Sequence, residues 1–314
     1  SGEPGGAMSI RIRGTSSITG NSEPLYVIDG FPIENDIEGQ SVGTGGRERT
    51  VPQNPLVTLN PNDIESISIL KDASSTAIYG ARGANGVVII TTRQGRGTRP
   101  QFGFESYYGV QGLAKQYEML NAEEYMAYAN AFGQNSSTPF TPFPDSVRAR
   151  ILASGINTNW QDEIFRAAPI RNYQLSVRGA TTTASPTRYN LSGGLFDSEG
   201  IVVNSGLRRV SGRVNLNQAI GSRVEFGGSF SASRARSHRV PTGGQQNAGA
   251  GAISAAIQYV PILPVRRADG TYSLINTDLN AYASQLDAPQ TPNPVSLAVE
   301  VRDSLSDTRF LGNA

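Results

Sequence analysis

The sequence predicts an α+β unit followed by long antiparallel strands of the kind that cross a membrane in a β-barrel. A change of pattern near Arg99 supports this fold class. Before it, short apolar segments lie among dense turn signals, and after it apolar and polar residues alternate strictly. The 314 residues include only 17% charged residues but 35 Gly and 18 Pro, which is typical of strand-rich and turn-rich proteins. We therefore expect two regions, residues 1–98 and 99–314.

The first region is predicted to contain a small mixed sheet and one short helix. Apolar segments at 10–13, 25–28, 64–70 and 87–92 predict its strands. We expect Asp72 to cap a helix over residues 73–79 and Gly80 to end it in the left-handed conformation. Asp29-Gly30 is expected to form a turn rather than to supply a catalytic carboxylate.

The second region is predicted to contain strands at 101–110, 171–180, 187–196, 207–217 and 222–234, with another from 308. Their length of about ten residues matches that needed to cross a bilayer at a tilt. Arg178 and Arg213 fall on the polar face, and Arg208 and Arg234 fall on the apolar face at expected strand ends. The apolar positions of the alternation are expected to face away from the first region, as in Tyr173, Leu175, Val177, Val224, Phe226 and Phe230.

The alternation alone would equally suit a soluble sandwich or barrel with one wet face. The lengths of the links between strands favour the membrane interpretation. Links 111–170, 197–206 and 235–307 are long, whereas links 181–186 and 218–221 between them are short. Such parity is typical of an up-and-down barrel with long loops on one side of a membrane and tight turns on the other.

Two segments of the first region resemble a known signature. The two segments are PLYVIDGFP at residues 24–32 and LNPNDIESISILKDASSTAIYGARGANGVVIITT at residues 59–92. They are similar, in residue identity and in order, to the plug domain of the SusC/RagA family. This is a family of TonB-dependent outer-membrane transporters. The segments IRIRG at 10–14 and SEGI at 198–201 also resemble family segments.

The resemblance implies an α+β plug domain followed by the N-terminal part of an antiparallel transmembrane β-barrel, which has 22 strands in the full-length family. The chain would supply the C-terminal larger part of the plug as residues 1–98 and the first five to six strands as residues 99–314. Loops 111–170 and 235–307 would be extracellular. The TonB box of the family is expected to lie outside this sequence.

The resemblance also implies partners and a set of structural or gating residues. The expected partners are a SusD-like surface lipoprotein, TonB, outer-membrane lipid and a ligand, an oligosaccharide in the first place and a peptide as the second possibility. The expected location is the outer membrane of a Gram-negative bacterium of the Bacteroidetes type. The signature residues are Asp29, Gly30, Lys71, Asp72, Tyr79, Gly80, Arg82, Gly83 and Gly86.

Composition excludes several classes of chemistry. With no Cys and one His, His238, the chain lacks thiol nucleophiles, cysteine-based metal sites and multi-histidine sites. A net charge of +1 does not support binding to nucleic acid. The glycines at 80, 83 and 86 have the spacing GxxGxxG after an expected helix, which differs from the dinucleotide fingerprint. We therefore expect no enzyme, no catalytic residue and no cofactor.

Two further groups of residues leave alternatives open. The carboxylates Asp36, Glu38 and Glu48 could hold calcium, but their spacing is not that of an EF-hand, and no metal site is predicted. Loop aromatics could stack on sugar rings, although packing within the loops is the favoured interpretation; they are Phe140, Phe143, Trp160, Tyr259, Tyr272 and Tyr282. A short helix capped by Asn121 is expected in the first loop. The alternative function is a soluble, secreted β-rich binding or adhesion domain.

Overall fold

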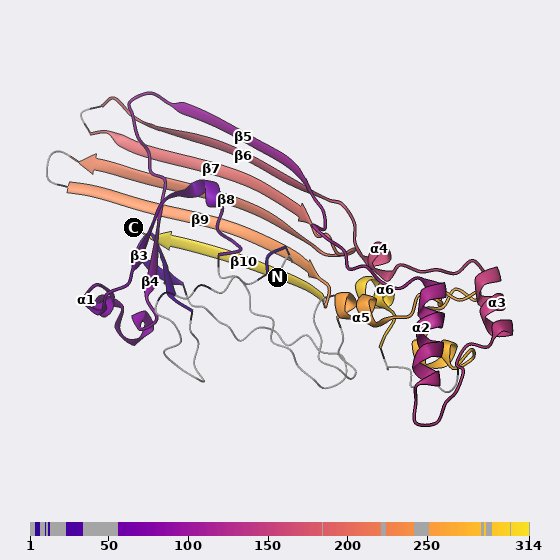
Figure 1. Cartoon of the computed structure of the whole chain (residues 1–314). Helices are drawn as coiled ribbons and strands as arrows, with labels where there is room; N and C mark the ends of the chain where they lie inside the picture. The colour runs from indigo at the N-terminus through magenta and orange to yellow at the C-terminus, as the bar shows by residue number, and fades with distance from the viewer. Residues whose placement is uncertain are drawn as a thin grey trace.

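The computed structural model has three parts: an N-terminal unit, a large curved sheet and a helical body at one end of that sheet (Figure 1). It describes residues 4–6, 10, 12, 23–33, 56–183, 185–220, 224–241, 251–283, 286, 291–301 and 303–313. Half of the strand predicted at 10–13, and the three carboxylates Asp36, Glu38 and Glu48, lie outside these residues. No helix in the described part of the chain is long and apolar enough to cross a membrane.

The N-terminal unit contains a four-stranded sheet with the order β2-β1-β4-β3. Its strands are β1 (Leu25–Ile28), β2 (Phe31–Ile33), β3 (Ile64–Leu70) and β4 (Val87–Thr92), with η1 (Pro61–Asp63) leading into β3. The central pair β1 and β4 is parallel, and the two outer pairs are antiparallel. Val87, Val88 and Ile90 are buried on both faces of the sheet, as the apolar run predicts.

The helix predicted over residues 73–79 is shorter and more irregular than expected. It consists of α1 (Ala73–Thr76) followed by the 3-10 segment η2 (Ala77–Gly83). Asp72 occupies the N-cap position, but its exposed side chain makes no capping hydrogen bond; its backbone oxygen accepts from Ser75 and Thr76 instead. Gly80 has a φ of 59° as expected, yet its ψ of −146° makes it a kink after which a helical turn resumes. The predictions of a side-chain cap and of an end at Gly80 are therefore wrong.

The large sheet has six antiparallel strands in chain order, with β5 and β10 at its edges in the described part of the chain. The strands are β5 (Gln101–Gln111), β6 (Ala168–Ala180), β7 (Thr187–Glu199), β8 (Gly206–Ile220), β9 (Val224–Arg239) and β10 (Asp303–Asn313). Most are longer than predicted, because the alternation continues through polar segments such as 235–239. The link between β7 and β8 therefore shrinks to residues 200–205, which is no longer than the turn between β6 and β7. The expected difference in length between these two links is wrong.

The two faces of the large sheet differ as the alternation predicts. On the outer face, Leu175, Phe226 and Phe230 are 65%, 62% and 51% exposed. Tyr173 and Val224 are also exposed, and Val177 is half-buried on the same face. The N-terminal unit hydrogen-bonds to side chains of opposite parity, such as Gln174 and Arg213. The apolar side chains thus point away from the N-terminal unit.

The helical body is built from the two long loops and from residues 200–205. It contains α2 (Ala122–Gln134), α3 (Asp145–Ala153), α4 (Trp160–Ile164), α5 (Ala252–Gln258), the π-helix η3 (Ile275–Leu279) and α6 (Pro294–Val299). Asn121 and Glu124 form a capping box at the start of α2, which confirms the predicted helix. A single apolar core joins these elements and includes Phe143, Trp160 and Tyr259. The favoured interpretation is thus confirmed for four of the six loop aromatics, Phe143, Trp160, Tyr259 and Tyr282, whereas Phe140 and Tyr272 are not among the core residues.

Candidate functional site

The inner face of the large sheet presents buried polar side chains to the N-terminal unit. Gln174, Asn190, Arg209, Arg213 and Asn215 each have at most 8% of their surface exposed. Facing them, the N-terminal unit buries polar groups of its own: Thr58, Asn60, Asp63 and Thr92. Buried polar groups are normally hydrogen-bonded, because an unpaired one costs free energy. We call this set of contacts the unit–sheet interface.

The strongest contact of the unit–sheet interface joins Asp29 to Arg213. Both terminal nitrogens of the Arg213 guanidinium lie 3.1 Å from Oδ2 of Asp29. Thr92 donates to the same carboxylate from its backbone N–H at 2.8 Å and from its hydroxyl at 2.7 Å. The side chain of Arg213 is 4% exposed and that of Asp29 is 16% exposed. This is a buried, charge-assisted pair with its hydrogen-bonding capacity largely used.

The local sequence explains how Asp29 reaches the large sheet. Asp29 and Gly30 link β1 to β2 with φ values of 48° and 89°. A two-residue hairpin turn with positive φ at both positions favours Asp-Gly, because Gly and Asp tolerate that conformation. The predicted turn is confirmed. It also places the carboxylate beyond the strand ends, where Thr92 closes the neighbouring strand β4.

A second contact forms around Asp63 at the end of η1. Oδ1 of Asp63 accepts from Nε2 of Gln174 at 3.1 Å and from the hydroxyl of Ser192 at 2.7 Å. The other end of the Gln174 amide accepts from Asn60 at 3.1 Å. Two adjacent strands of the large sheet, β6 and β7, thereby hold one short turn of the N-terminal unit.

Backbone oxygens of the N-terminal unit accept further hydrogen bonds from the large sheet. Asn190 and Asn215 both donate to the carbonyl of Arg93, at 3.0 and 2.7 Å. Arg209 donates to the carbonyls of Val57 and Leu59 at 3.1 and 2.8 Å. Because these acceptors are main-chain atoms, the contacts depend on the path of the chain rather than on its side chains.

Two clefts of about 440 Å³ each flank η1 on the inner face of the sheet. One is bordered by charged and amide groups and includes Asp63, Arg93, Glu105 and Arg178. The other combines the rings of Tyr107 and Phe196 with the amides of Asn60, Asn62 and Asn172 and with Arg209. Aromatic faces beside planar hydrogen-bonding groups can hold a polar ligand that has apolar faces.

The predicted signature residues lie in two different places. Asp29 and Gly30 are at the unit–sheet interface, whereas the others lie around α1 and η2 or next to β4. Lys71, Asp72, Gly80 and Arg82 are exposed, and Tyr79 is half-buried. Gly83 and Gly86 are buried. A Cβ atom at position 83 would lie 2.9 Å from Thr76 O, and one at position 86 would lie 2.9 Å from Ile12 Cδ1. Close packing therefore explains why positions 83 and 86 are occupied by glycine.

The sequence analysis did not single out most residues of the unit–sheet interface. It placed Arg213 on the polar face but assigned no partner to it, and it gave no role to Asp63, Thr92 or Arg209. One signal in the sequence could have indicated this interface. Large polar side chains occupy inward positions of β6–β8, where Ser or Gly would suffice on a face that only contacts water. Their partners are 97 to 184 residues away in the chain, and no local pattern identifies them.

Comparison with known proteins agrees with this architecture. The family model of the TonB-dependent receptor plug domain matches residues 1–87. Over 99% of its length, the chain is 32% identical to the TonB-dependent receptor SusC of Bacteroides thetaiotaomicron and to the TonB-dependent receptor P3 of Formosa agariphila. Among solved structures, the RagAB peptide transporter matches 94% of the chain with a TM-score of 0.69 and 26% identity.

The chain belongs to the TonB-dependent receptors of the SusC/RagA type. It spans 29% of the length of SusC, 26% of that of P3 and 33% of the matched chain of the RagAB transporter. In this SusC/RagA-type chain the N-terminal unit is plug structure, and the six antiparallel strands correspond to the N-terminal part of the barrel wall. The unit–sheet interface is therefore the contact between plug and wall.

Proposed function

We propose that this chain is the N-terminal part of an outer-membrane importer, with residues 1–98 in the plug and residues 99–314 in the first strands of the barrel. The division of the large sheet into an apolar outer face and a polar inner face is the observation that supports this most. The outer face suits hydrocarbon, and the inner face is hydrogen-bonded to the plug. A soluble sandwich would instead bury its apolar face.

The plug is held by contacts that water can replace. A 22-stranded barrel is too wide to retain solutes by itself, so the plug must block it and must move for import. Hydrogen bonds exchange for bonds to water with a small net change, which makes a polar interface suitable for reversible movement. We propose that force from TonB disrupts the contacts at Asp29 and Asp63, and that the signature residues around α1 and η2 transmit it.

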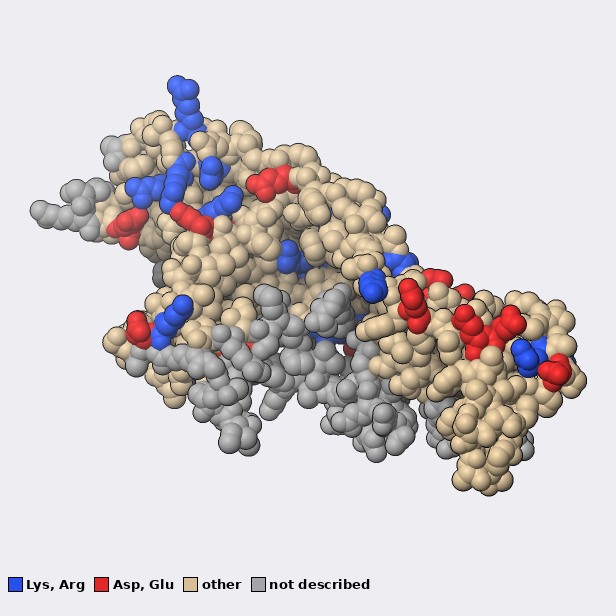
Figure 2. Space-filling model, viewed as in Figure 1, with Lys and Arg blue, Asp and Glu red and all other residues tan. Residues whose placement is uncertain are grey.

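The helical body is proposed to lie outside the cell and to contact a SusD-like lipoprotein. It is formed mainly by the loops between β5 and β6 (112–167) and between β9 and β10 (240–302), which belong to the long-loop end of the sheet. Figure 2 shows acidic side chains gathered over this body. Exposed apolar residues lie beside them, including Tyr117, Tyr128 and Phe132. Exposed aromatic residues are enriched at protein-binding surfaces, whose rims are polar.

The proposed cargo is an oligosaccharide. The cleft with Tyr107, Phe196 and three asparagines offers ring faces and amides, which suit the alternating apolar and hydroxyl surfaces of sugars. A peptide is the second candidate, because the RagAB structures that resemble this chain are those of a peptide transporter. The full-length receptor, purified with its lipoprotein, should release oligosaccharides on denaturation; recovery of peptides alone would favour the second candidate.

A cross-link between plug and wall tests the importer proposal. Asp63 and Ser192 are in direct contact, and this chain has no cysteine, so Asp63→Cys with Ser192→Cys gives a defined pair. In the full-length receptor in cells, bridging the pair with a short bifunctional thiol reagent should abolish uptake of labelled ligand. The double variant without the reagent, and each single cysteine variant with it, set the uptake against which the effect of the cross-link is measured. Undiminished uptake through the cross-linked receptor would contradict movement at this interface.

The alternative is a soluble, secreted binding domain without transport activity. Fractionation separates the two, because an importer is recovered with outer membranes and requires detergent, whereas a secreted domain stays in solution. We propose no enzymatic role and no binding of nucleic acid. Within the described residues, no group of three potential ligands could hold a metal ion.

A further inference from the structure

The outer face of the large sheet has a cluster of arginines at the end next to the helical body. Arg208 on β8 lies directly opposite Arg236 on β9. Arg234, two residues along β9, lies opposite Val210 on the same face. All three are exposed. We call them the arginine patch. Because β9 continues to Arg239, Arg234 is inside the strand and not at its end as the sequence predicted.

The arginine patch is not neutralised by the part of the chain that the structure describes. Like charges directly opposite each other destabilise an antiparallel pair. The nearest carboxylate in the same row, Asp197, lies opposite Arg208 but pairs with Arg171 at 3.6 Å. Nε of Arg234 donates to Ser306 at 3.4 Å, and among described residues none of the three arginines has an ion pair. An external anion would remove the repulsion between Arg208 and Arg236.

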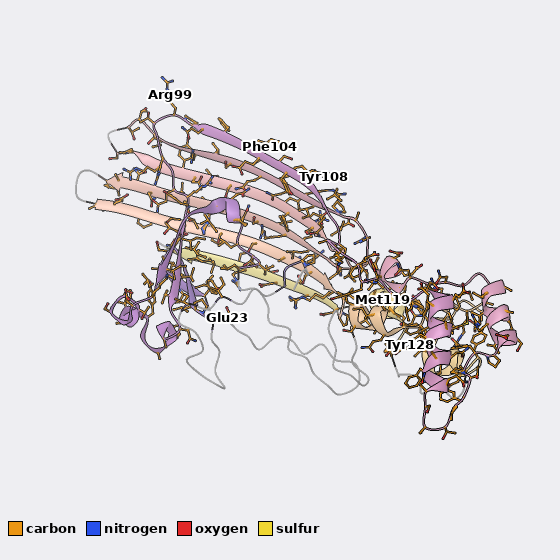
Figure 3. All side chains as sticks on the ribbon, in the orientation of Figure 1. Glu23, Arg99, Phe104, Tyr108, Met119 and Tyr128 are labelled. Atoms are coloured by element: carbon orange, nitrogen blue, oxygen red, sulfur yellow. The ribbon has the colours of Figure 1, made fainter. Side chains whose placement is uncertain are left out.

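The position of the arginine patch suggests which anion this is. The next outward row toward the short turns contains Tyr173, Leu195 and Val210 beside Arg234, and the rows after it are apolar and include Leu175 and Phe230. Tyr108 on β5 lies in the same row as Arg208, through Arg171 and Asp197 (Figure 3). An aromatic residue at the edge of an apolar band is typical of the membrane boundary. The arginines therefore lie at headgroup level.

We infer that the arginine patch binds the phosphate of a lipid headgroup in the leaflet at the long-loop end. Guanidinium groups form two parallel hydrogen bonds to phosphate, and two opposed arginines can bind one phosphate from both sides. The apolar rows next to the patch would contact the acyl chains of the same lipid. This inference rests on the proposed function, because it requires the sheet to span the outer membrane.

The test uses the full-length receptor in nanodiscs that contain lipid A with two phosphates or the same lipid A after dephosphorylation. Bound lipid is counted by native mass spectrometry after release from the nanodisc. The double variant Arg208→Gln with Arg236→Gln is compared with Arg99→Gln and Arg188→Gln together. The control removes the same charge from exposed positions at the short-turn end of the sheet. Inorganic phosphate is added as a competitor.

The unmodified receptor and the control variant should retain phosphorylated lipid A in preference to the dephosphorylated form. In the patch variant, this preference should fall roughly tenfold to thirtyfold. Equal retention by all three proteins would overturn the inference, as would full displacement by millimolar inorganic phosphate, which would indicate a site for free phosphate. Incorporation into nanodiscs is scored separately. A receptor that incorporates without headgroup preference contradicts only this inference, and one that does not incorporate contradicts the proposed function.

Discussion

The helical body and the unit–sheet interface, which joins plug and wall, are held together by different interactions. In the helical body, Trp160 and Tyr259 meet edge to face at 4.5 Å inside a continuous apolar core. At the interface, the closest contacts are an ion pair and hydrogen bonds through Asp29, Asp63 and Arg213. Separating apolar surfaces exposes them to water at a large cost, whereas separated polar groups regain hydrogen bonds from water. The helical body should therefore resist separation of its parts more strongly than the contact between plug and wall does.

The largest effect is expected from Trp160→Ala in the helical body. Trp160 is buried, and its indole N–H donates to the carbonyl of Val260 at 2.9 Å, which links the first long loop to the second. Removing such a side chain typically costs about 3–5 kcal/mol. Hydrogen exchange should show loss of protection in both 112–167 and 240–302, while β6 to β9 stay protected.

Phe132→Ala is the matched control for this prediction. Phe132 lies on α2 in the same body but is 60% exposed, so its removal should leave exchange in the second loop unchanged. If Trp160→Ala leaves the second loop fully protected, the two loops do not share one core and the comparison with the interface fails.

The next largest effect is expected from Arg213→Met. This change keeps an unbranched side chain but leaves the Asp29 carboxylate buried without its cation. Removing one partner of a buried pair typically costs about 3–5 kcal/mol, and the residual exposure of Asp29 places the effect at the lower end of that range. Exchange should speed up in β1 and β4 of the plug, with little change in the helical body.

Two variants distinguish the ion pair from packing alone. Adding Asp29→Asn to Arg213→Met should recover part of the lost protection, because the uncompensated charge is removed. Arg178→Met removes an inward arginine of β6 whose Nε, among the residues that the structure describes, bonds only to Gln101 on β5, and it should leave plug exchange unchanged. Equal loosening of the plug by Arg178→Met and Arg213→Met would show that the pair with Asp29 has no special role.

The same contrast explains how much of the molecule the sequence could predict. The Asp29-Gly30 turn and the outward positions of Leu175 and Phe226 follow from local rules, and both are confirmed. The pairing of Asp29 with Arg213 joins residues 184 positions apart, and it depends on the curvature of a sheet that local pattern does not define. The hydrogen bond from Trp160 to Val260 joins residues 100 positions apart, and it likewise depends on the tertiary fold. Neither contact leaves a periodic signal in the sequence.

A smaller effect is expected from Ser192→Ala. Its hydroxyl donates to Asp63 at 2.7 Å, and the loss of one hydrogen bond to a charged group costs about 1.5–3 kcal/mol when the group is buried, less where water can enter from the adjacent cleft. Ser176 lies directly opposite Ser192 on the same inner face. Ser176→Ala should therefore be nearly neutral. Release of the plug on heating is measured by limited proteolysis after η1. Ser192→Ala should release the plug at a lower temperature than Ser176→Ala. Identical profiles would argue against Asp63 as an anchor.

The smallest effect concerns pH and belongs to the helical body alone. Burial raises the pKa of Tyr125 to about 12 from its ordinary value of 10.0, and its ring packs edge to face against Phe143 at 6.1 Å. Because the folded form keeps its proton longer than the unfolded form, the stability from this group is fully present below about pH 10 and declines as the pH rises toward 12.

Tyr125→Phe should make the stability of the helical body less dependent on pH in that window. Some dependence will remain, because burial also raises the pKa of Tyr259 in the same core. The plug–wall interface has no tyrosine among the hydrogen-bonding partners described above, so its exchange should follow the same pH profile in both proteins. Hydrogen exchange or proteolysis of loop 112–167 between pH 9 and 12 measures the difference. An unchanged slope in Tyr125→Phe would mean that this ring is hydrated in solution and that the apolar core ends short of α2.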